Sequence, residues 1–257
     1  MTRTIDLNCD MGESFGAWTM GQDAEVLAYV SSANIACGFH AGDPATMRRT
    51  VSAAVARDVA IGAHPSLPDL AGFGRREMRV SPDETYAMTL YQIGALAAIA
   101  RAAGARPRHV KPHGALYNMA AKDRALADAI AHAVRDFDAT LILVGLAGSE
   151  LPRAGEAAGL SVAHEAFADR RYEMDGSLMA RGKPGAVIDD VDSAVAQAIS
   201  IATRGEATGP GGAVHVRADT ICVHGDRADA GHFAQRLRES LEAAGVTIAA
   251  IGKEHAA

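Results

Sequence analysis

Short apolar runs rich in β-branched residues alternate along the chain with longer stretches in which apolar positions recur at helical spacing. This alternation is typical of βα units repeated around a parallel sheet. Seven runs are predicted as strands, and an eighth run near the C-terminus is a further candidate. The predicted strands are residues 4–9, 33–38, 59–63, 109–112, 140–144, 161–164 and 220–223, and the candidate is 246–250.

Boundary residues support the helices predicted between these strands. Ser81, Pro82 and Glu84 supply a capping hydroxyl, a proline for the first turn and a capping-box glutamate, and Gly104 supplies a stop. The glycine-rich stretch 205–212 is predicted as a flexible loop. No internal repeat or linker interrupts the pattern, so we expect residues 1–257 to form a single domain.

Seven or eight βα units are compatible with a closed barrel or with an open doubly wound sheet, because periodicity does not give the order of the strands. Both architectures place ligands at the loops that leave the C-terminal ends of the strands. We therefore look for the functional residues in those loops.

Composition narrows the classes of function. Of the 257 residues, 49% are hydrophobic and 22% charged, and the net charge is −6 with the basic residues scattered, so no nucleic-acid partner is expected. No apolar run approaches the roughly 18 residues of a membrane span, and no signal peptide is recognisable, which predicts a cytoplasmic protein without a membrane partner. Cys9, Cys37 and Cys222 are too widely spaced for a disulfide framework or a CxxC zinc site, and we expect them to be buried.

Ionisable side chains concentrate at the predicted strand ends. Asp10 and Glu13 follow the first strand. Four of the ten histidines stand at the ends of four different strands, and parallel strands bring those ends together. These histidines are His40, His64, His113 and His224.

Lys111 is the strongest single anomaly, because it lies inside a short strand where a buried ammonium group is costly unless it meets an anion. We expect it to face a ligand or a carboxylate such as Asp10 or Glu13. A loop after the third strand, residues 72–76, carries Arg75 and Arg76 and is interpreted either as a flexible lid suited to a carboxylate or phosphate or as a solvated turn.

Several familiar motifs are missing. Residues 176–183 resemble a phosphate-binding loop but have five residues between the glycines, and Pro184 stands where a magnesium-binding Ser or Thr is required. The chain has no GxGxxG after a strand, no GxSxG and no HExxH. Dinucleotide, serine-hydrolase and zincin chemistry therefore lose their usual support.

Six segments together resemble the LamB/YcsF family of 5-oxoprolinase A subunits: DLNCDMGESFG, ANIACGFHAGDP, GAHPSLPDLAGFGRR, VKPHGALYN, EAFADRRY and ICVHGD. The resemblance covers nearly the whole chain. It implies an α/β fold, a distorted seven-stranded parallel (β/α) barrel of the glycoside hydrolase/deacetylase class. It also implies ATP-dependent opening of 5-oxo-L-proline to L-glutamate with two partner subunits, with ATP and Mg²⁺ as cofactors.

The implied reaction suggests roles for the candidate residues. Lys111 and the group Arg75, Asp169, Arg170 and Arg181 are candidates for binding phosphate or the substrate carboxylate. Asp10 or Glu13 would activate the attacking water, and histidines would protonate the leaving nitrogen.

Two alternatives remain. Asp10, His40 and His64, from three successive strands, would form the metal site of an amide hydrolase, as in related deacetylases, with zinc or manganese. The chain would otherwise be a non-catalytic subunit that binds 5-oxoproline or a sugar while a partner performs the chemistry.

Overall fold

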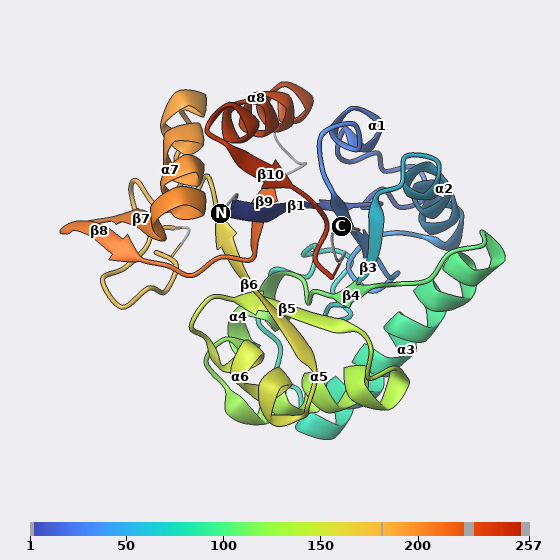
Figure 1. Ribbon diagram of the computed structural model, residues 1–257. Coiled ribbons are helices and arrows are strands. Elements are labelled where there is room, and N and C mark those ends of the chain that lie inside the picture. The colour runs from blue at the N-terminus through green and yellow to red at the C-terminus, as the bar shows by residue number, and fades with distance from the viewer. Residues whose placement is uncertain (1–2, 181, 224–228, 253–257) are drawn as a thin grey trace.

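Seven parallel strands close into a barrel in the order β1-β2-β3-β4-β5-β6-β9, and β9 pairs again with β1 (Figure 1). The computed structural model describes residues 3–180, 182–223 and 229–252. The barrel strands are β1 (Arg3–Met11), β2 (Ser32–Ala36), β3 (Ala60–His64), β4 (His109–Val110), β5 (Ile142–Leu146), β6 (Ser161–Phe167) and β9 (Thr220–Val223). The predicted seven-stranded barrel is confirmed, and the open sheet is wrong.

β1 closes the barrel. Its residues Asp6–Cys9 pair with Thr220–Val223 of β9, and Asn8–Met11 pair with Ser32–Ile35 of β2. The candidate eighth strand also exists as β10 (Val246–Ile248), which pairs with residues Arg3–Ile5 at the start of β1.

Helices surround the barrel (Figure 1). They are α1 (Asp23–Val26), α2 (Pro44–Val55), α3 (Pro82–Ala102), α4 (Gly114–Ala120), α5 (Arg124–Phe137), α6 (Glu150–Ala157), α7 (Val191–Arg204) and α8 (Ala230–Ala243). At the start of α3 the predicted capping box is present, since the Ser81 hydroxyl accepts from the Glu84 amide and the Glu84 carboxylate accepts from the Ser81 amide. Among the described residues, none of the helices combines the length and apolarity that crossing a membrane requires.

The predicted flexible loop at 205–212 is wrong. This stretch begins the antiparallel hairpin of β7 (Glu206–Gly209) and β8 (Gly212–His215), which lies beside α7 (Figure 1). Ala207 and Val214 are buried, and the Pro210-Gly211 pair joins the strands. The glycines and the proline form the turn of the hairpin. Because they dominate the composition of this stretch, the alternating apolar positions on either side of the turn did not indicate strands.

The side chains that β1 directs into the barrel are polar. Successive side chains of a strand point to opposite faces, so Asp6, Asn8 and Asp10 share one face of β1 while Leu7, Cys9 and Met11 belong to the hydrophobic core. Across the interior, Asn8 donates to Glu165 Oε1 (3.0 Å) and to Thr220 Oγ1 (2.7 Å). The Asn8 amide therefore links β1 to β6 and β9 inside the barrel.

Candidate functional site

A cavity of about 550 Å³ opens beside the C-terminal ends of β1, β3 and β4. Asp10, His64, Lys111 and His113 are among the residues that line it, and residues 175–180 line it as well. The volume suits a small ligand. Four of the residues predicted to be catalytic thus share one cavity.

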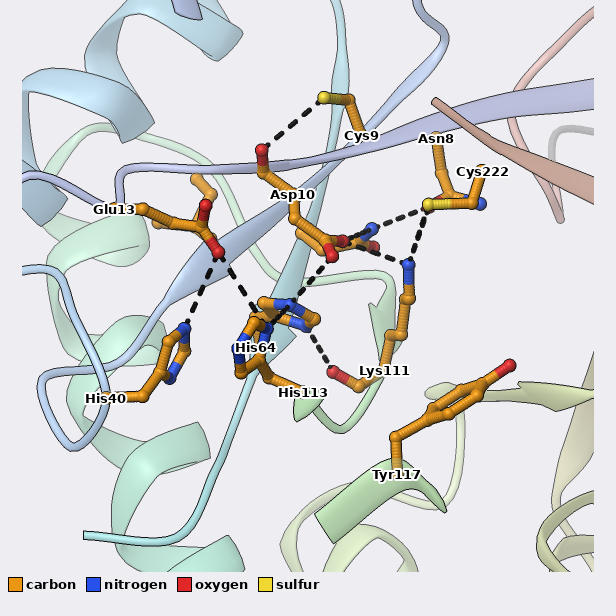
Figure 2. Close-up of polar contacts among 12 residues, drawn as sticks. Asn8, Cys9, Asp10, Glu13, His40, His64, Lys111, His113, Tyr117 and Cys222 are labelled. Carbon is orange, nitrogen blue, oxygen red and sulfur yellow. Dashed lines mark hydrogen bonds and ion pairs between the residues drawn. The ribbon is translucent and has the colours of Figure 1, made fainter. Parts of the chain in front are cut away.

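Lys111 is buried between two carboxylates. Its Nζ lies 2.9 Å from Asp10 Oδ1 and 2.8 Å from Glu165 Oε1 (Figure 2 shows the contact with Asp10). Burial lowers the pKa of the ammonium, but the carboxylates of Asp10 and Glu165 outweigh it and hold the pKa well above its usual value. Burial likewise raises the pKa of Asp10, and His64 and Lys111 reverse this and bring it well below its usual value. The pair is therefore an ammonium beside a carboxylate over the physiological range. The predicted anion partner is confirmed for Asp10, whereas Glu165 takes the place suggested for Glu13.

Glu165 and Tyr117 belong to the site without having been assigned to it from the sequence. The Tyr117 hydroxyl donates to Glu165 Oε2 at 2.7 Å, and the Glu165 side chain is fully buried. A carboxylate inside the apolar run of β6 carries the same signal that singled out Lys111 in β4. The Cys222 thiol also lies here, 3.2 Å from Lys111 Nζ.

Backbone carbonyl groups orient two histidines at the cavity wall. His64 Nδ1 lies 2.6 Å from the carbonyl oxygen of Lys111, and His113 Nε2 lies 2.9 Å from that of Phe73. The other ring nitrogens, His64 Nε2 and His113 Nδ1, are 3.0 Å apart. His64 Nε2 is also 3.2 Å from Asp10 Oδ2. Burial, followed by the neighbouring His64, lowers the pKa of His113 to about 3.

Glu13 and His40 complete a cluster with these two rings (Figure 2). His40 is fully buried, and its ring stacks on that of His113 with centroids 3.9 Å apart. Burial and the neighbouring His113 and His64 bring the pKa of His40 well below its usual value. One ligand atom from each of Glu13, His40, His64 and His113 lies within 4.8 Å of the others, so this group has donors suited to a metal ion. Asp10 of the predicted triad lies next to this group, with its Oδ1 held by Lys111 and Asn34.

The predicted flexible lid, residues 72–76, is packed against the site. Phe73 and Gly74 both have positive φ, 55° and 64°, and a Cβ on Gly74 would lie 2.8 Å from His40 Cβ and 3.0 Å from His113 Cδ2. The Gly74 carbonyl accepts from the Ala115 amide at 2.8 Å. A side chain at this position would therefore force Ser66, His40 and His113 to shift. Of the two interpretations of this loop, the solvated turn agrees better with the structure, because Arg75 and Arg76 are exposed while Gly74 is buried against the histidines.

The predicted basic residues have different positions. Arg75 lines the cavity, with its guanidinium 5.0 Å from the centroid of the Phe73 ring, while Arg76 forms an ion pair with Asp69. Arg170 lines the cavity and donates through Nη2 to the Met179 carbonyl at 2.7 Å.

Asp169 is buried and is not among the described residues that line the cavity. Arg181 and His224 lie outside the described residues. Their roles stay predictions.

The three cysteines are free thiols and buried, as predicted. Burial raises the pKa of Cys37 to about 12 and that of Cys222 well above its usual value, although Lys111 opposes the shift at Cys222. Burial also raises the pKa of Cys9 well above its usual value. All three are therefore protonated thiols at neutral pH, and Cys222 contributes a neutral wall beside Lys111.

Comparison with known proteins identifies the family. Residues 5–256 match the LamB/YcsF family. The chain is 62% identical to the A subunit of 5-oxoprolinase from Methylococcus capsulatus, over 98% of this chain and 97% of the relative. It is 60% identical to the corresponding protein from Tolumonas auensis, over 96% of this chain and 99% of the relative. The crystal structure of the lactam utilization protein from Thermus thermophilus superposes with a TM-score of 0.93 at 49% identity, over 96% of this chain and 100% of that chain. The chain therefore belongs to the LamB/YcsF family.

Proposed function

We propose that this chain is the A subunit of an ATP-dependent 5-oxoprolinase, which opens the lactam of 5-oxo-L-proline to L-glutamate together with two partner subunits. The observation that carries the proposal is the buried Lys111, held between Asp10 and Glu165 at the wall of a small cavity, in a chain about 60% identical to proteins named as A subunits of 5-oxoprolinase. The ATP requirement and the free thiols favour the cytoplasm as its location.

The proposed reaction breaks the ring C–N bond, adds the oxygen of water to the carbonyl carbon and delivers a proton to the nitrogen. A lactam is a resonance-stabilised amide, so its carbonyl must be activated and its water must lose a proton. Transfer of the ATP γ-phosphoryl group to the amide oxygen would supply the activation. Water then adds to the activated carbon, and the tetrahedral intermediate collapses with loss of the ring nitrogen, which takes up a proton, to give an acyl phosphate. A second water hydrolyses the acyl phosphate to the glutamate carboxylate and inorganic phosphate.

The residues of the cavity suit these steps. Lys111 remains protonated because its pKa is raised, so it serves to bind negative charge rather than to accept a proton. Asp10 remains a carboxylate and lies at the cavity wall, where it can orient the attacking water. Arg75 and Arg170 line the same cavity and supply cations for the substrate carboxylate or the phosphate of Mg²⁺-ATP.

The test is a reconstitution of the chain with its two candidate partner subunits. Glutamate and phosphate are measured after addition of 5-oxoproline and ATP, and each component is omitted in turn. We expect one phosphate for each glutamate and no glutamate from proline or from a non-hydrolysable ATP analogue. Absence of both products with well-folded proteins would contradict the proposal, and glutamate formed without ATP would favour a direct amide hydrolase.

Two variants separate catalysis from simple binding. Lys111→Met removes the cation, and His132→Gln changes an exposed histidine on α5 as the matched control. We expect Lys111→Met to reduce kcat by at least about a hundredfold, the usual size of the loss when a group that stabilises developing charge is removed. Full turnover by this variant would mean that a partner performs the chemistry.

A further inference from the structure

Two histidine ring nitrogens in the cluster, His64 Nε2 and His113 Nδ1, face each other with a lone pair on each. A carbonyl oxygen only accepts hydrogen bonds, so the Lys111 carbonyl, 2.6 Å from His64 Nδ1, places the proton of His64 on Nδ1. In the same way the Phe73 carbonyl, 2.9 Å from His113 Nε2, places the proton of His113 on Nε2. His64 Nε2 and His113 Nδ1 are then both unprotonated, and they lie 3.0 Å apart. Two acceptors at this distance require a cation between or beside them.

His40 extends this arrangement. Both of its ring nitrogens are buried and have no hydrogen-bond partner in the described part of the chain. Its Nε2 lies 3.7 Å from Glu13 Oε1, and the same oxygen lies 3.8 Å from His113 Nδ1 (Figure 2). Three imidazole rings and one carboxylate thus point toward one small volume, and their ligand atoms all lie within 4.8 Å of one another.

A proton does not satisfy this group. One extra proton on His64 Nε2 allows a single hydrogen bond, to His113 Nδ1 or to Asp10 Oδ2. Both nitrogens of His40 would still lack a hydrogen-bond partner among the described residues. A metal ion accepts all four donors at once. Four ligands at about 2.0–2.2 Å from a tetrahedral ion lie roughly 3.3–3.6 Å apart, which is close to the separations of 3.0, 3.7 and 3.8 Å observed here.

We propose that Glu13, His40, His64 and His113 bind one divalent transition-metal ion of the zinc class. Three imidazoles and one carboxylate are the donors such ions prefer. The carbonyls behind His64 and His113 are the outer hydrogen-bond partners that orient metal-binding histidines. This set differs from the predicted triad because Glu13 and His113 join His40 and His64, while the carboxylate of Asp10 binds Lys111.

The ion would lie next to the cavity, because His64 and His113 both line it. An ion there would place positive charge beside Asp10 and would keep His64 and His113 unprotonated on the nitrogens that face it. Those two histidines would then hold the metal rather than supply a proton to a leaving group. The proposal concerns binding by this chain, so it stands or falls independently of the lactam reaction.

The test uses the full-length chain stripped of metal with a chelator and titrated with zinc and with cobalt(II). We expect one equivalent of zinc to remain per chain after dialysis, measured by elemental analysis. Cobalt(II) should give the visible absorption of a site with four or five ligands. X-ray absorption of the zinc form should show three imidazole rings at about 2.0–2.1 Å and no sulfur.

Glu13→Gln and His40→Gln are the diagnostic variants, and His132→Gln is the control. Glu13→Gln keeps the shape of a side chain that is 9% exposed, so it tests the site without removing volume from the core. We expect each diagnostic variant to weaken zinc binding by at least about tenfold and the control to leave it unchanged. Circular dichroism confirms that each variant is folded. The proposal is overturned if the folded wild-type chain binds neither ion, if both diagnostic variants bind zinc like the wild type, or if the absorption spectrum shows sulfur ligands.

Discussion

Removing the ammonium group of Lys111 tests the electrostatic core of the site. In the native chain it lies 2.9 Å from Asp10 and 2.8 Å from Glu165. At an effective dielectric constant of about 20, each contact is worth about 6 kcal/mol of Coulomb attraction. Desolvation costs several kcal/mol for each ion and offsets most of this, so the net contribution of the arrangement is small. The substitution Lys111→Met leaves both carboxylates without their cation, and we expect it to lower the free energy of unfolding by about 3–5 kcal/mol.

The assay is urea denaturation at pH 7, followed by circular dichroism, of the wild type, Lys111→Met, Glu165→Gln and the double variant. Glu165→Gln should destabilise the wild type, because it removes one partner of Lys111. In the Lys111→Met background the same substitution should stabilise the chain, because it neutralises a buried carboxylate that has lost its partner. The prediction is therefore a change of sign between the two backgrounds.

Acidification gives a second readout of the same effect. Protonation removes the charge of a buried carboxylate that has lost its cation, so the destabilising effect disappears as the pH falls toward the ordinary titration range of carboxylates, about 4. The deficit of Lys111→Met should shrink correspondingly between pH 7 and pH 4. An equal cost of Glu165→Gln in both backgrounds, with a deficit independent of pH, would refute the reasoning.

Three further predictions concern neighbouring groups. Gly74→Ala should lower the free energy of unfolding by about 2–4 kcal/mol in thermal or urea unfolding, because φ is positive and the added methyl group meets His113 and its neighbours; unchanged stability would mean that the loop yields freely. Tyr117→Phe should lower the free energy of unfolding by about 1.5–3 kcal/mol, measured in the same way, because the hydrogen bond to buried Glu165 is lost. A decrease below about 0.5 kcal/mol, the size of an ordinary surface change, would contradict this. Because the folded pKa of Asp10 lies well below 3.8, the stability that the carboxylate contributes is present above pH 3.8 and is lost as the pH falls through the folded pKa. The difference in unfolding free energy between the wild type and Asp10→Asn should therefore narrow on acidification. A difference that does not change with pH would contradict the lowered pKa of Asp10.

The strands and their ends could be predicted from the sequence. The seven predicted strands and the candidate eighth all exist, most of them with shifted ends and 220–223 with its predicted bounds, because apolar β-branched runs between turn residues indicate burial. Asp10, His64, Lys111 and His113 share a cavity because parallel strands end on the same side of a barrel.

The polar interior could not be predicted in the same way. The pairing of Lys111 with Glu165 joins the end of β4 to β6, which are not adjacent in the barrel, so it depends on closure and on the direction of both side chains. The alternation of Asp6, Asn8 and Asp10 with apolar residues was legible, but it does not tell which face of β1 points inward. The membership of His113 in the histidine cluster rests on the orientation of its ring, which the Phe73 carbonyl from another segment helps to fix.

The pairing of β1 with β9 has a consequence for how the protein is made. It joins residues 6–9 to residues 220–223, so almost the whole chain must leave the ribosome before the barrel can close. Until then Asn8 lacks Thr220, and the first strand has an open edge that other chains can pair with. We expect β1 to gain protection from hydrogen exchange only in the last step of refolding, which pulse-labelling would reveal, and earlier protection there would show that β2 alone holds it.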